Sequence, residues 1–283
     1  MRDKGCIGIV GNGFVGNAVY QNVRDKAPTK VYDVEPNRSF NTLEEVLGEE
    51  FIFVCLPTPM RMDGSCDLSI LEKFFEDIDH PDNYAIDEEH TFIIKSTVPI
   101  GTTKRLAEKH DLLWIVHNPE FLTARNAVKD FAHAERTVIG GDPLLTSRVA
   151  NLYWRYIYSG CCGDFHSEVI QCSSDESEAI KYFSNTFLAY KVAYFNKIYD
   201  MCEKVGMDYK NVLEGVTGDS RIGESHTKVP GIDGDRGFGG TCFPKDLNSL
   251  IVQLEKEGVN ADMFREIWKY NQEIRTVIDW TVT

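Results

Sequence analysis

The sequence predicts an α/β protein with two domains, a doubly wound, mostly parallel sheet in residues 1–172 and an all-helical domain in residues 173–283. Short apolar runs alternate with helical patterns in the first part, which is typical of a parallel sheet with helices on both faces. In the second part, a helical pattern runs from Asp175 to Val205 without proline or glycine, and Gly206 ends it.

The expected strands are short runs of buried-type side chains. They are Cys6–Val10, Lys30–Asp33, Phe51–Leu56, Thr91–Lys95, Trp114–His117 and Thr137–Ile139. Helical periodicity separates several of them, at Asn17–Arg24, Ser69–Asp79 and Thr102–His110. In the second domain, the acidic residues after Ser173 suit the first turn of the long helix, and further helices are expected at Pro244–Glu257 and Asp262–Trp280.

Composition narrows the choice of partners and compartment. The net charge of −14 argues against a nucleic-acid partner and against an anionic membrane surface. No apolar run reaches the length of a membrane span, and the N-terminus leads directly into a strand, so we expect no membrane segment and no signal peptide. None of the eight cysteines forms a C-x-x-C pair, which favours a reduced cytoplasmic protein without a metal site.

A glycine-rich turn stands between the first strand and the first helix. Gly11, Gly13 and Gly16 form the pattern G-x-G-x-x-G, with Phe14 and Val15 in its last gap. The first glycine permits a tight turn, the second lets a pyrophosphate approach the backbone, and the third lets the helix pack on the strand. This context predicts a Rossmann-like dinucleotide site that these five residues form.

Asp33 ends the second strand, where an acid can accept a hydrogen bond from a ribose 2′-hydroxyl and repel a 2′-phosphate. We therefore expect NAD as the cofactor. The alternatives are that Asp33 is only a turn residue, or that the nearby Arg38 accommodates the phosphate of NADP.

Three strand ends carry hydroxyl or carboxylate groups, at Pro57–Pro59, Ser96–Pro99 and Asn118–Phe121. In a doubly wound sheet, ligands meet the loops at the carboxyl ends of the strands. Each segment can be a simple turn, but together they indicate a binding rim.

One cysteine has an unusual setting in the second domain. Cys242 follows three glycines and precedes Pro244, which suits the first position of a helix. A helix N-terminus and the adjacent Lys245 would both favour the thiolate. The alternative is a small core residue after a tight turn.

Two further features carry polar groups that can serve a site. Lys181 and Asn185 are spaced i, i+4 on the long helix, among apolar neighbours, so they are either a solvated face or partly buried. The loop from Gly218 to Gly240 contains Arg221 and three other cations, which suit an anionic diphosphate, or it is only a flexible connector.

The chain resembles the UDP-glucose/GDP-mannose dehydrogenase family. The resemblance covers nearly the whole chain and rests on motifs that occur in the family's order. They are Gly11–Gly16, Cys55–Pro59, Ser96–Pro99, Asn118–Leu122, Lys181–Asn196, Arg221–Gly223 and Gly237–Asp246.

This resemblance implies an NAD-dependent, four-electron oxidation of a nucleotide-sugar 6-hydroxyl to a carboxylate, with UDP-glucose the favoured substrate. It implies that Cys242 is the nucleophile, that Lys181 and Asn185 stabilise an oxyanion, and that Asp246 and Thr97 hold a water while Glu120 acts as a general base. It assigns Pro57, Thr58, Ser96 and Lys245 to the cofactor. Substrate contacts fall on Phe121, Leu122, Phe238, Gly239, Phe243 and Arg221. Arg221 would reach the site of a second subunit, in a homodimer formed through the long helix.

Two departures from the family pattern affect what carries over. Ala124 stands where the family usually has a glutamate, assigned to cofactor contact or to hydrolysis. Family members also usually continue into a third domain that helps to bind uridine diphosphate, whereas this sequence stops at Thr283, so we expect a short form or a truncation. Two other functions stay open, a two-electron hydroxyacid dehydrogenase and a non-catalytic protein that binds NAD or a nucleotide sugar.

Overall fold

The computed structural model describes residues 7–80, 84, 90–123, 125–159 and 167–280. It divides into two compact units, Met1–Thr58 with Leu68–Lys181, and Pro59–Asp67 with Tyr182–Thr283. The second cut falls inside the long helix α7 (Ser174–Val205). These units do not test the expected domain boundary after residue 172, which remains a prediction.

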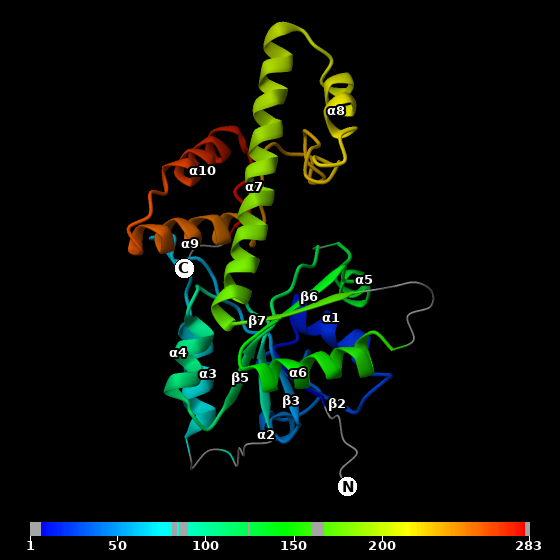
Figure 1. Cartoon of the computed structure of the whole chain (residues 1–283), viewed down its shortest axis with the longest axis vertical. Coiled ribbons are helices and arrows are strands. Elements are labelled where there is room, and N and C mark those ends of the chain that lie inside the picture. The colour runs from blue at the N-terminus through cyan, green and yellow to red at the C-terminus, as the bar shows by residue number, and fades with distance from the viewer. Residues whose placement is uncertain (1–6, 81–83, 85–89, 124, 160–166, 281–283) are drawn as a thin grey trace. The chain divides into compact units, whose positions relative to one another are not determined.

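The first unit is built on a sheet with seven strands among the described residues (Figure 1). The spatial order is β2-β1-β3-β4-β5-β6-β7, and only β5 and β6 pair antiparallel. The strands are β1 (Ile7–Val10), β2 (Thr29–Tyr32), β3 (Phe51–Val54), β4 (Thr91–Ile94), β5 (Trp114–His117), β6 (Arg136–Gly140) and β7 (Glu168–Cys172). This topology confirms the predicted doubly wound α/β class; Cys6, in the predicted first strand, lies outside the described residues.

Both faces of the sheet are buried because successive side chains of each strand point to opposite sides. Phe51 and Phe53 of β3 enter one apolar core, whereas Ile52 and Val54 enter the other. The first core is covered by α1 (Phe14–Val23), α5 (Ala127–Ala132), α6 (Pro143–Leu152) and the π-helix η1 (Tyr153–Ile157). The second is covered by α2 (Leu43–Leu47), α3 (Ser69–Asp79) and α4 (Thr102–Lys109).

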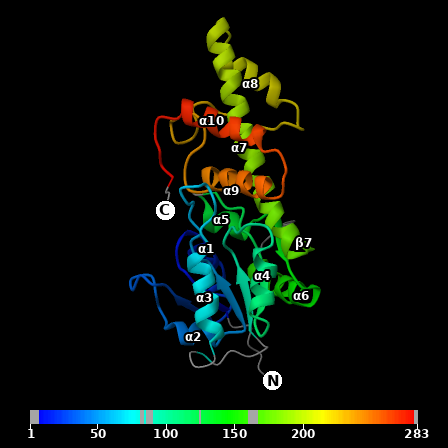
Figure 2. The ribbon, with the colours of Figure 1, turned by 90° about the vertical axis from the view of Figure 1, so that its left-hand side faces the viewer.

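The second unit is helical in its described residues, apart from one bridge between Met60 and Cys66 (Figure 2). It contains α7 from Tyr182 onward, with α8 (Tyr209–Thr217), α9 (Phe243–Lys256) and α10 (Asp262–Ile274). Its core contains small and large apolar side chains from α7, α9 and α10 and from the segments before α9 and α10, which are Ala189, Ala193, Phe238, Leu247, Ile251, Ala261 and Ile267. Among the described helices, none is both long and apolar enough to cross a membrane.

The last helix is shorter than predicted. It ends at Ile274 rather than at Trp280, because the backbone of Arg275 is extended. The guanidinium of Arg275 is buried and pairs with Asp233 (2.9 Å) and Asp279 (3.0 Å). Val277, Ile278 and Trp280 in this segment are apolar, but the segment is held by these polar contacts and not by helical hydrogen bonds.

A buried carboxylate ties α7 to α4. Glu178 accepts hydrogen bonds from the backbone N–H groups of Gly101 (2.6 Å) and Thr103 (2.7 Å), at the N-terminus of α4. Burial raises the pKa of Glu178 to about 7, although the hydrogen bonds from Thr103 and Gly101 favour the carboxylate. The folded protein therefore holds this proton over a pH range in which an unfolded glutamate has already lost it.

We expect Glu178→Gln to gain stability relative to the wild type as the pH rises from 5 to 8. A raised pKa means that the wild type loses stability between the unfolded pKa, near 4.3, and the folded pKa, whereas the amide does not titrate. The gain should be on the order of 2 kcal/mol in the free energy of unfolding. Urea denaturation across this pH range measures it.

Glu203→Gln is the matched control, because Glu203 is exposed on the same helix. Its stability difference from the wild type should not vary with pH. A difference for Glu178→Gln that stays constant from pH 5 to 8 would contradict the raised pKa.

Candidate active site

The glycine turn after β1 has the shape of a nucleotide cradle. Gly11 has a φ of +88°, and a Cβ there would lie 2.5 Å from the carbonyl oxygen of Cys55. A Cβ on Gly16 would lie 1.8 Å from the carbonyl oxygen of Gly11, so both positions require glycine. A Cβ on Gly13 would meet nothing within 4 Å, which leaves open space beside the N-terminus of α1, where Phe14 and Val15 form the first turn.

Asp33 follows β2 and lies beside this turn, as predicted. Its Oδ2 accepts from the backbone N–H of Asn12 (2.6 Å) and its Oδ1 from that of Glu35 (2.9 Å). Asn12 donates its side-chain amide to the carbonyl of Arg38 (2.7 Å), while its Oδ1 is buried and has no hydrogen-bond partner within the described chain. An unsatisfied polar atom, an adjacent carboxylate and an uncapped helix N-terminus suit a ribose and a pyrophosphate. The residues present therefore fit a dinucleotide.

The ends of β3 and β4 are joined by hydroxyl groups. Thr58 donates its hydroxyl to the carbonyl of Thr97 (2.8 Å), and Ser96 donates its hydroxyl to the carbonyl of Leu56 (2.6 Å). Pro57 lies between these contacts and is exposed. The structure thus brings together two of the three predicted rim segments through direct hydrogen bonds.

The third rim segment, after β5, carries a buried ion pair. The ammonium of Lys181 on α7 donates to the carboxylate Oε1 of Glu120 (2.9 Å) and to its backbone carbonyl (2.6 Å). The other carboxylate oxygen accepts from the N–H of Leu122 (2.6 Å), and the Lys181 ammonium lies 5.3 Å from the centre of the Phe121 ring. Lys181 is 3% exposed and Glu120 9%, which excludes the solvated-face interpretation for Lys181.

Residues that the sequence did not single out anchor this segment. Asn118 accepts from the ammonium of Lys95 (2.9 Å) and from the hydroxyl of Tyr153 (2.5 Å). His117 contacts the hydroxyl of Ser177 on α7 (2.8 Å), and burial lowers the pKa of His117 to about 3, so the ring is neutral. A lysine that ends the apolar run of β4 is the sequence signal that could have indicated this network.

In the second unit, Cys242 immediately precedes α9 and is exposed. Its carbonyl accepts the helical hydrogen bond from Asp246 (2.8 Å), and Pro244 stands in the first turn as predicted. A thiol at an uncapped helix N-terminus faces the positive end of the helix dipole. This placement excludes the alternative of a core cysteine.

Asp246 is the centre of a second buried cluster. One of its oxygens accepts from Lys245 (2.6 Å) and the other from the side-chain amide of Asn185 on α7 (2.6 Å). Asp246 is 1% exposed. Although burial favours a neutral amine, the charge of Asp246 raises the pKa of Lys245. The cluster therefore keeps an ammonium beside the cysteine helix.

The glycine loop before Cys242 is held from α10. Asn271 accepts from the N–H of Phe238 (2.7 Å) and donates to its carbonyl (2.9 Å). A Cβ on Gly239 would lie 2.0 Å from the Arg275 guanidinium and 2.3 Å from the Asp279 carboxylate, so a larger residue would displace these two side chains. The ring of Phe238 packs in the core against Phe243, and its backbone N–H and carbonyl are both bonded to Asn271.

Three other predictions concern Arg221, Ala124 and metal binding. Arg221 is exposed and pairs with Asp219 (2.5 Å). Ala124 lies outside the described residues. Among the residues that are described, no three His, Cys, Asp or Glu side chains are grouped so that they could hold a metal ion.

Two family models match the chain. Residues 29–157 match the NAD-binding domain of the UDP-glucose/GDP-mannose dehydrogenase family, and residues 175–273 match its central domain. The NAD-binding match includes Asp33 and confirms the prediction of NAD as the cofactor.

Curated relatives are similar along most of the chain. The UDP-glucose 6-dehydrogenase of Rickettsia bellii is 33% identical over 261 residues, which are 90% of this chain and 57% of the relative. The UDP-glucose 6-dehydrogenase TuaD of Bacillus subtilis is 31% identical over 278 residues, which are 95% of this chain and 55% of the relative. The chain therefore spans little more than half the length of these relatives.

Solved structures share the fold. A UDP-glucose dehydrogenase from the archaeon Pyrobaculum islandicum superposes with a TM-score of 0.80 and 26% identity, over 96% of this chain and 69% of that one. A 3-hydroxyisobutyrate dehydrogenase from Mycobacterium tuberculosis superposes with a TM-score of 0.74 over 95% of this chain and 94% of its own. Because the two sequences are only 16% identical, this likeness shows a shared fold and nothing more. Since models of both the NAD-binding and the central domain match in order, the chain belongs to the UDP-glucose/GDP-mannose dehydrogenase family.

Proposed function

We propose that the protein oxidises the 6-hydroxyl of a nucleotide sugar, with UDP-glucose favoured, to a carboxylate through a covalent intermediate on Cys242. The observation that carries the proposal is the exposed thiol at the N-terminus of α9, in a chain that also matches the NAD-binding domain of the family. A simple alcohol dehydrogenase has no use for such a nucleophile.

Gly11–Gly16 and Asp33 would hold NAD, which would supply the hydride acceptor; the two oxidations would use two NAD molecules in succession. Between them, the Cys242 thiolate adds to the aldehyde carbon and gives a thiohemiacetal, whose oxidation leaves a thioester. Water then attacks the thioester carbon, the carboxylate forms, and the sulfur leaves as thiolate. Lys181 and Asn185 are assigned to the oxyanion, because an ammonium and an amide N–H suit developing negative charge.

Proton transfer is assigned to the carboxylates. We assign Asp246, with Thr97, to hold the water and Glu120 to act as the general base in hydrolysis. Support comes from their burial, since a buried carboxylate with a fixed ammonium partner keeps one position. Pro57, Thr58, Ser96 and Lys245 are assigned to the cofactor. The substrate contacts are assigned to Phe121, Leu122, Arg221, Phe238, Gly239 and Phe243.

We also propose that a second copy of the chain packs along α7. From Phe183 to Met201, every exposed side chain of α7 except Lys197 is apolar or aromatic. The apolar positions are three, four or seven residues apart and form one stripe along the helix, which comprises Phe183, Phe187, Tyr190, Tyr194, Met201 and Val205. An exposed apolar stripe of this length is typical of a helix–helix interface.

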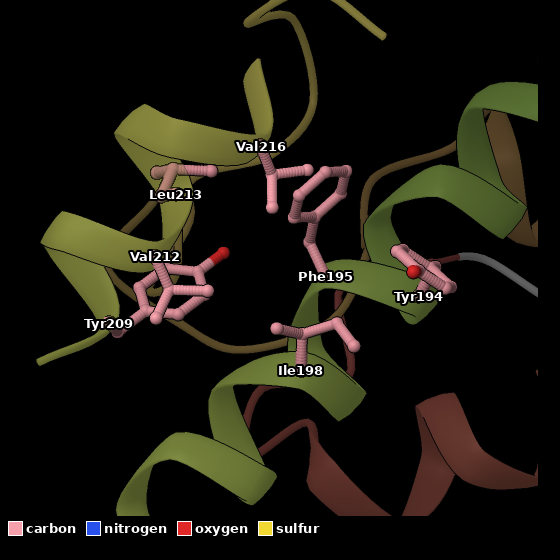
Figure 3. Close-up of a pocket in the computed structure, with 7 residues that line it drawn as sticks. All are labelled: Tyr194, Phe195, Ile198, Tyr209, Val212, Leu213 and Val216. Carbon is pink, nitrogen blue, oxygen red and sulfur yellow. The ribbon is translucent and has the colours of Figure 1, made fainter. Parts of the chain in front are cut away.

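A pocket of about 200 Å³ continues this stripe between α7 and α8 (Figure 3). Figure 3 shows its apolar side chains pointing toward one another from the two helices. They are Tyr194, Phe195, Ile198, Tyr209, Val212, Leu213 and Val216. Since α8 has no fully buried residue, a second copy would complete its packing.

We further propose a cytoplasmic location, because the absence of C-x-x-C pairs among the cysteines favours a reduced protein.

The stoichiometry of NADH tests the reaction. With UDP-glucose limiting and NAD in excess, the wild type should yield two NADH per sugar, and Cys242→Ser should stall because an alkoxide does not replace the thiolate. Absorbance at completion measures the yield. Cys172→Ser is the control, because burial raises the pKa of the Cys172 thiol and disfavours a thiolate. One NADH per sugar in both the wild type and Cys242→Ser would contradict the role of Cys242.

Asp33→Asn tests the choice of cofactor. Removing the charge that repels a 2′-phosphate should lower the ratio of kcat/KM for NAD to that for NADP by roughly tenfold or more, equivalent to about 1.4 kcal/mol. Glu35→Gln, a neutralisation two residues away, serves as control. An unchanged ratio in Asp33→Asn would assign Asp33 to the turn alone.

Phe187→Asp tests the proposed dimer. A charge in the middle of the stripe should raise the dissociation constant roughly 30-fold or more, as expected for loss of an anchor of about 2 kcal/mol. Sedimentation equilibrium measures this constant, and circular dichroism checks the fold. Glu203→Lys, also exposed on α7, should leave the mass unchanged. A wild type that is monomeric at all concentrations would refute this interface.

A further inference from the structure

Lys95 is a buried cation outside the roles assigned above. It directly follows β4 and is 2% exposed. Its ammonium donates to Asn118 Oδ1 (2.9 Å) and to the Tyr153 hydroxyl (3.4 Å), and it lies 5.5 Å from the centre of the Phe131 ring. No hydrogen bond or ion pair to a carboxylate is recorded for it within the described part of the chain. Burying an ammonium without a carboxylate partner costs free energy of folding, so we looked for a function that Lys95 could serve.

The groups that face Lys95 are mostly neutral. Burial raises the pKa of the Cys55 thiol to about 12 and that of the Tyr153 hydroxyl well above its usual value. His117 is neutral because burial lowers its pKa to about 3. The remaining charged neighbours are Glu120 and Lys181, which act on Lys95 with opposite sign. The carboxylate of Glu120 pairs with Lys181, and it acts on Lys95 only through its charge.

The surplus positive charge lies behind the proposed oxyanion site. The ammonium of Lys181 donates to the carboxylate and the carbonyl of Glu120, and the carboxylate partly neutralises the charge of Lys181. Lys95 restores a net positive charge to the cluster, and it fixes Asn118, two residues before Glu120. Asn118 also donates to the carbonyl of Val138 (2.6 Å) and so spans β5 and β6.

We propose that Lys95 is a positioning residue for the oxidation: it holds the Asn118–Glu120 segment and supplies the second positive charge that lets the Lys181–Glu120 pair stabilise an oxyanion. The inference rests on the proposed function. Burial lowers the pKa of Lys95 to about 8, with Glu120 opposing and Lys181 adding to the shift. The supporting charge is therefore present below pH 8 and lost above it.

Kinetics of Lys95→Met and Lys95→Arg test the role. Methionine keeps the length without the charge, and should lower kcat roughly tenfold, equivalent to about 1.4 kcal/mol of transition-state stabilisation, with KM for NAD unchanged. The wild-type pH profile of kcat should fall through a pKa near 8, and this limb should be absent in Lys95→Met. Lys95→Arg should recover part of kcat and hold it above pH 8, since a guanidinium stays charged.

Lys104→Met, an exposed lysine on α4, is the matched control and should behave as the wild type. Circular dichroism melting checks that each variant folds. A Lys95→Met enzyme with kcat within twofold of the wild type, or with the same limb near pH 8, would overturn the proposal.

A measurement without substrate separates this inference from the proposed function. Lysine Cε resonances, ¹³C-labelled and assigned with Lys95→Met and Lys181→Met, should show Lys95 titrating near pH 8. The Lys181 resonance should shift in the same step, and that shift should vanish in Lys95→Met. If the wild type forms no NADH but this coupling is present, the proposed function fails and the link between the two lysines holds. If the chemical shift of Lys181 does not change when Lys95 titrates, the inference fails whatever the enzyme oxidises.

Discussion

The first turns of α7 impose the constraint on which the first unit depends. Ser177, Glu178 and Lys181 point into the protein, where they are at most 3% exposed. A buried polar group that loses its partner costs about 1–3 kcal/mol, and more if it is charged. Each therefore needs a partner in the fold. Ser177 bonds to His117 at the end of β5, Glu178 to the N-terminus of α4, and Lys181 to Glu120 on the rim. These three buried hydrogen bonds fix the position of the first turns of α7, because a shift of the helix would break them.

This constraint explains why the sequence predicted the strands better than the site. Trp114–His117 and Ser69–Asp79 have the predicted bounds, because apolar runs and helical periodicity report burial directly. The predicted class and the glycine turn are confirmed for the same reason. The strand β7 was not predicted, since its edge position leaves it half-exposed and without an apolar run. The helix α2, of five residues, is too short for a periodic signal.

The site was predictable by residue type but not by partner. The i, i+4 spacing of Lys181 and Asn185 indicated a shared face, yet their partners Glu120 and Asp246 are each 61 residues distant in the chain. Long-range pairs of this kind leave no periodic trace in one sequence. The same holds for Arg275, whose burial against Asp233 and Asp279 ends α10 early, against an apolar pattern that favoured continuation.

The negative net charge of the chain explains why the buried lysines matter for binding anions. A chain with a net charge of −14 repels a diphosphate or a sugar oxyanion at long range. Salt limits that repulsion to about 8–10 Å, so the local field inside the site decides the interaction. Ammonium groups at the surface would be screened in the same way, whereas buried ones act through a medium of lower dielectric. Burying Lys95 and Lys181 near one carboxylate, Glu120, is therefore how an acidic protein can make one region favourable to negative charge. It also makes that property depend on the protonation of Lys95.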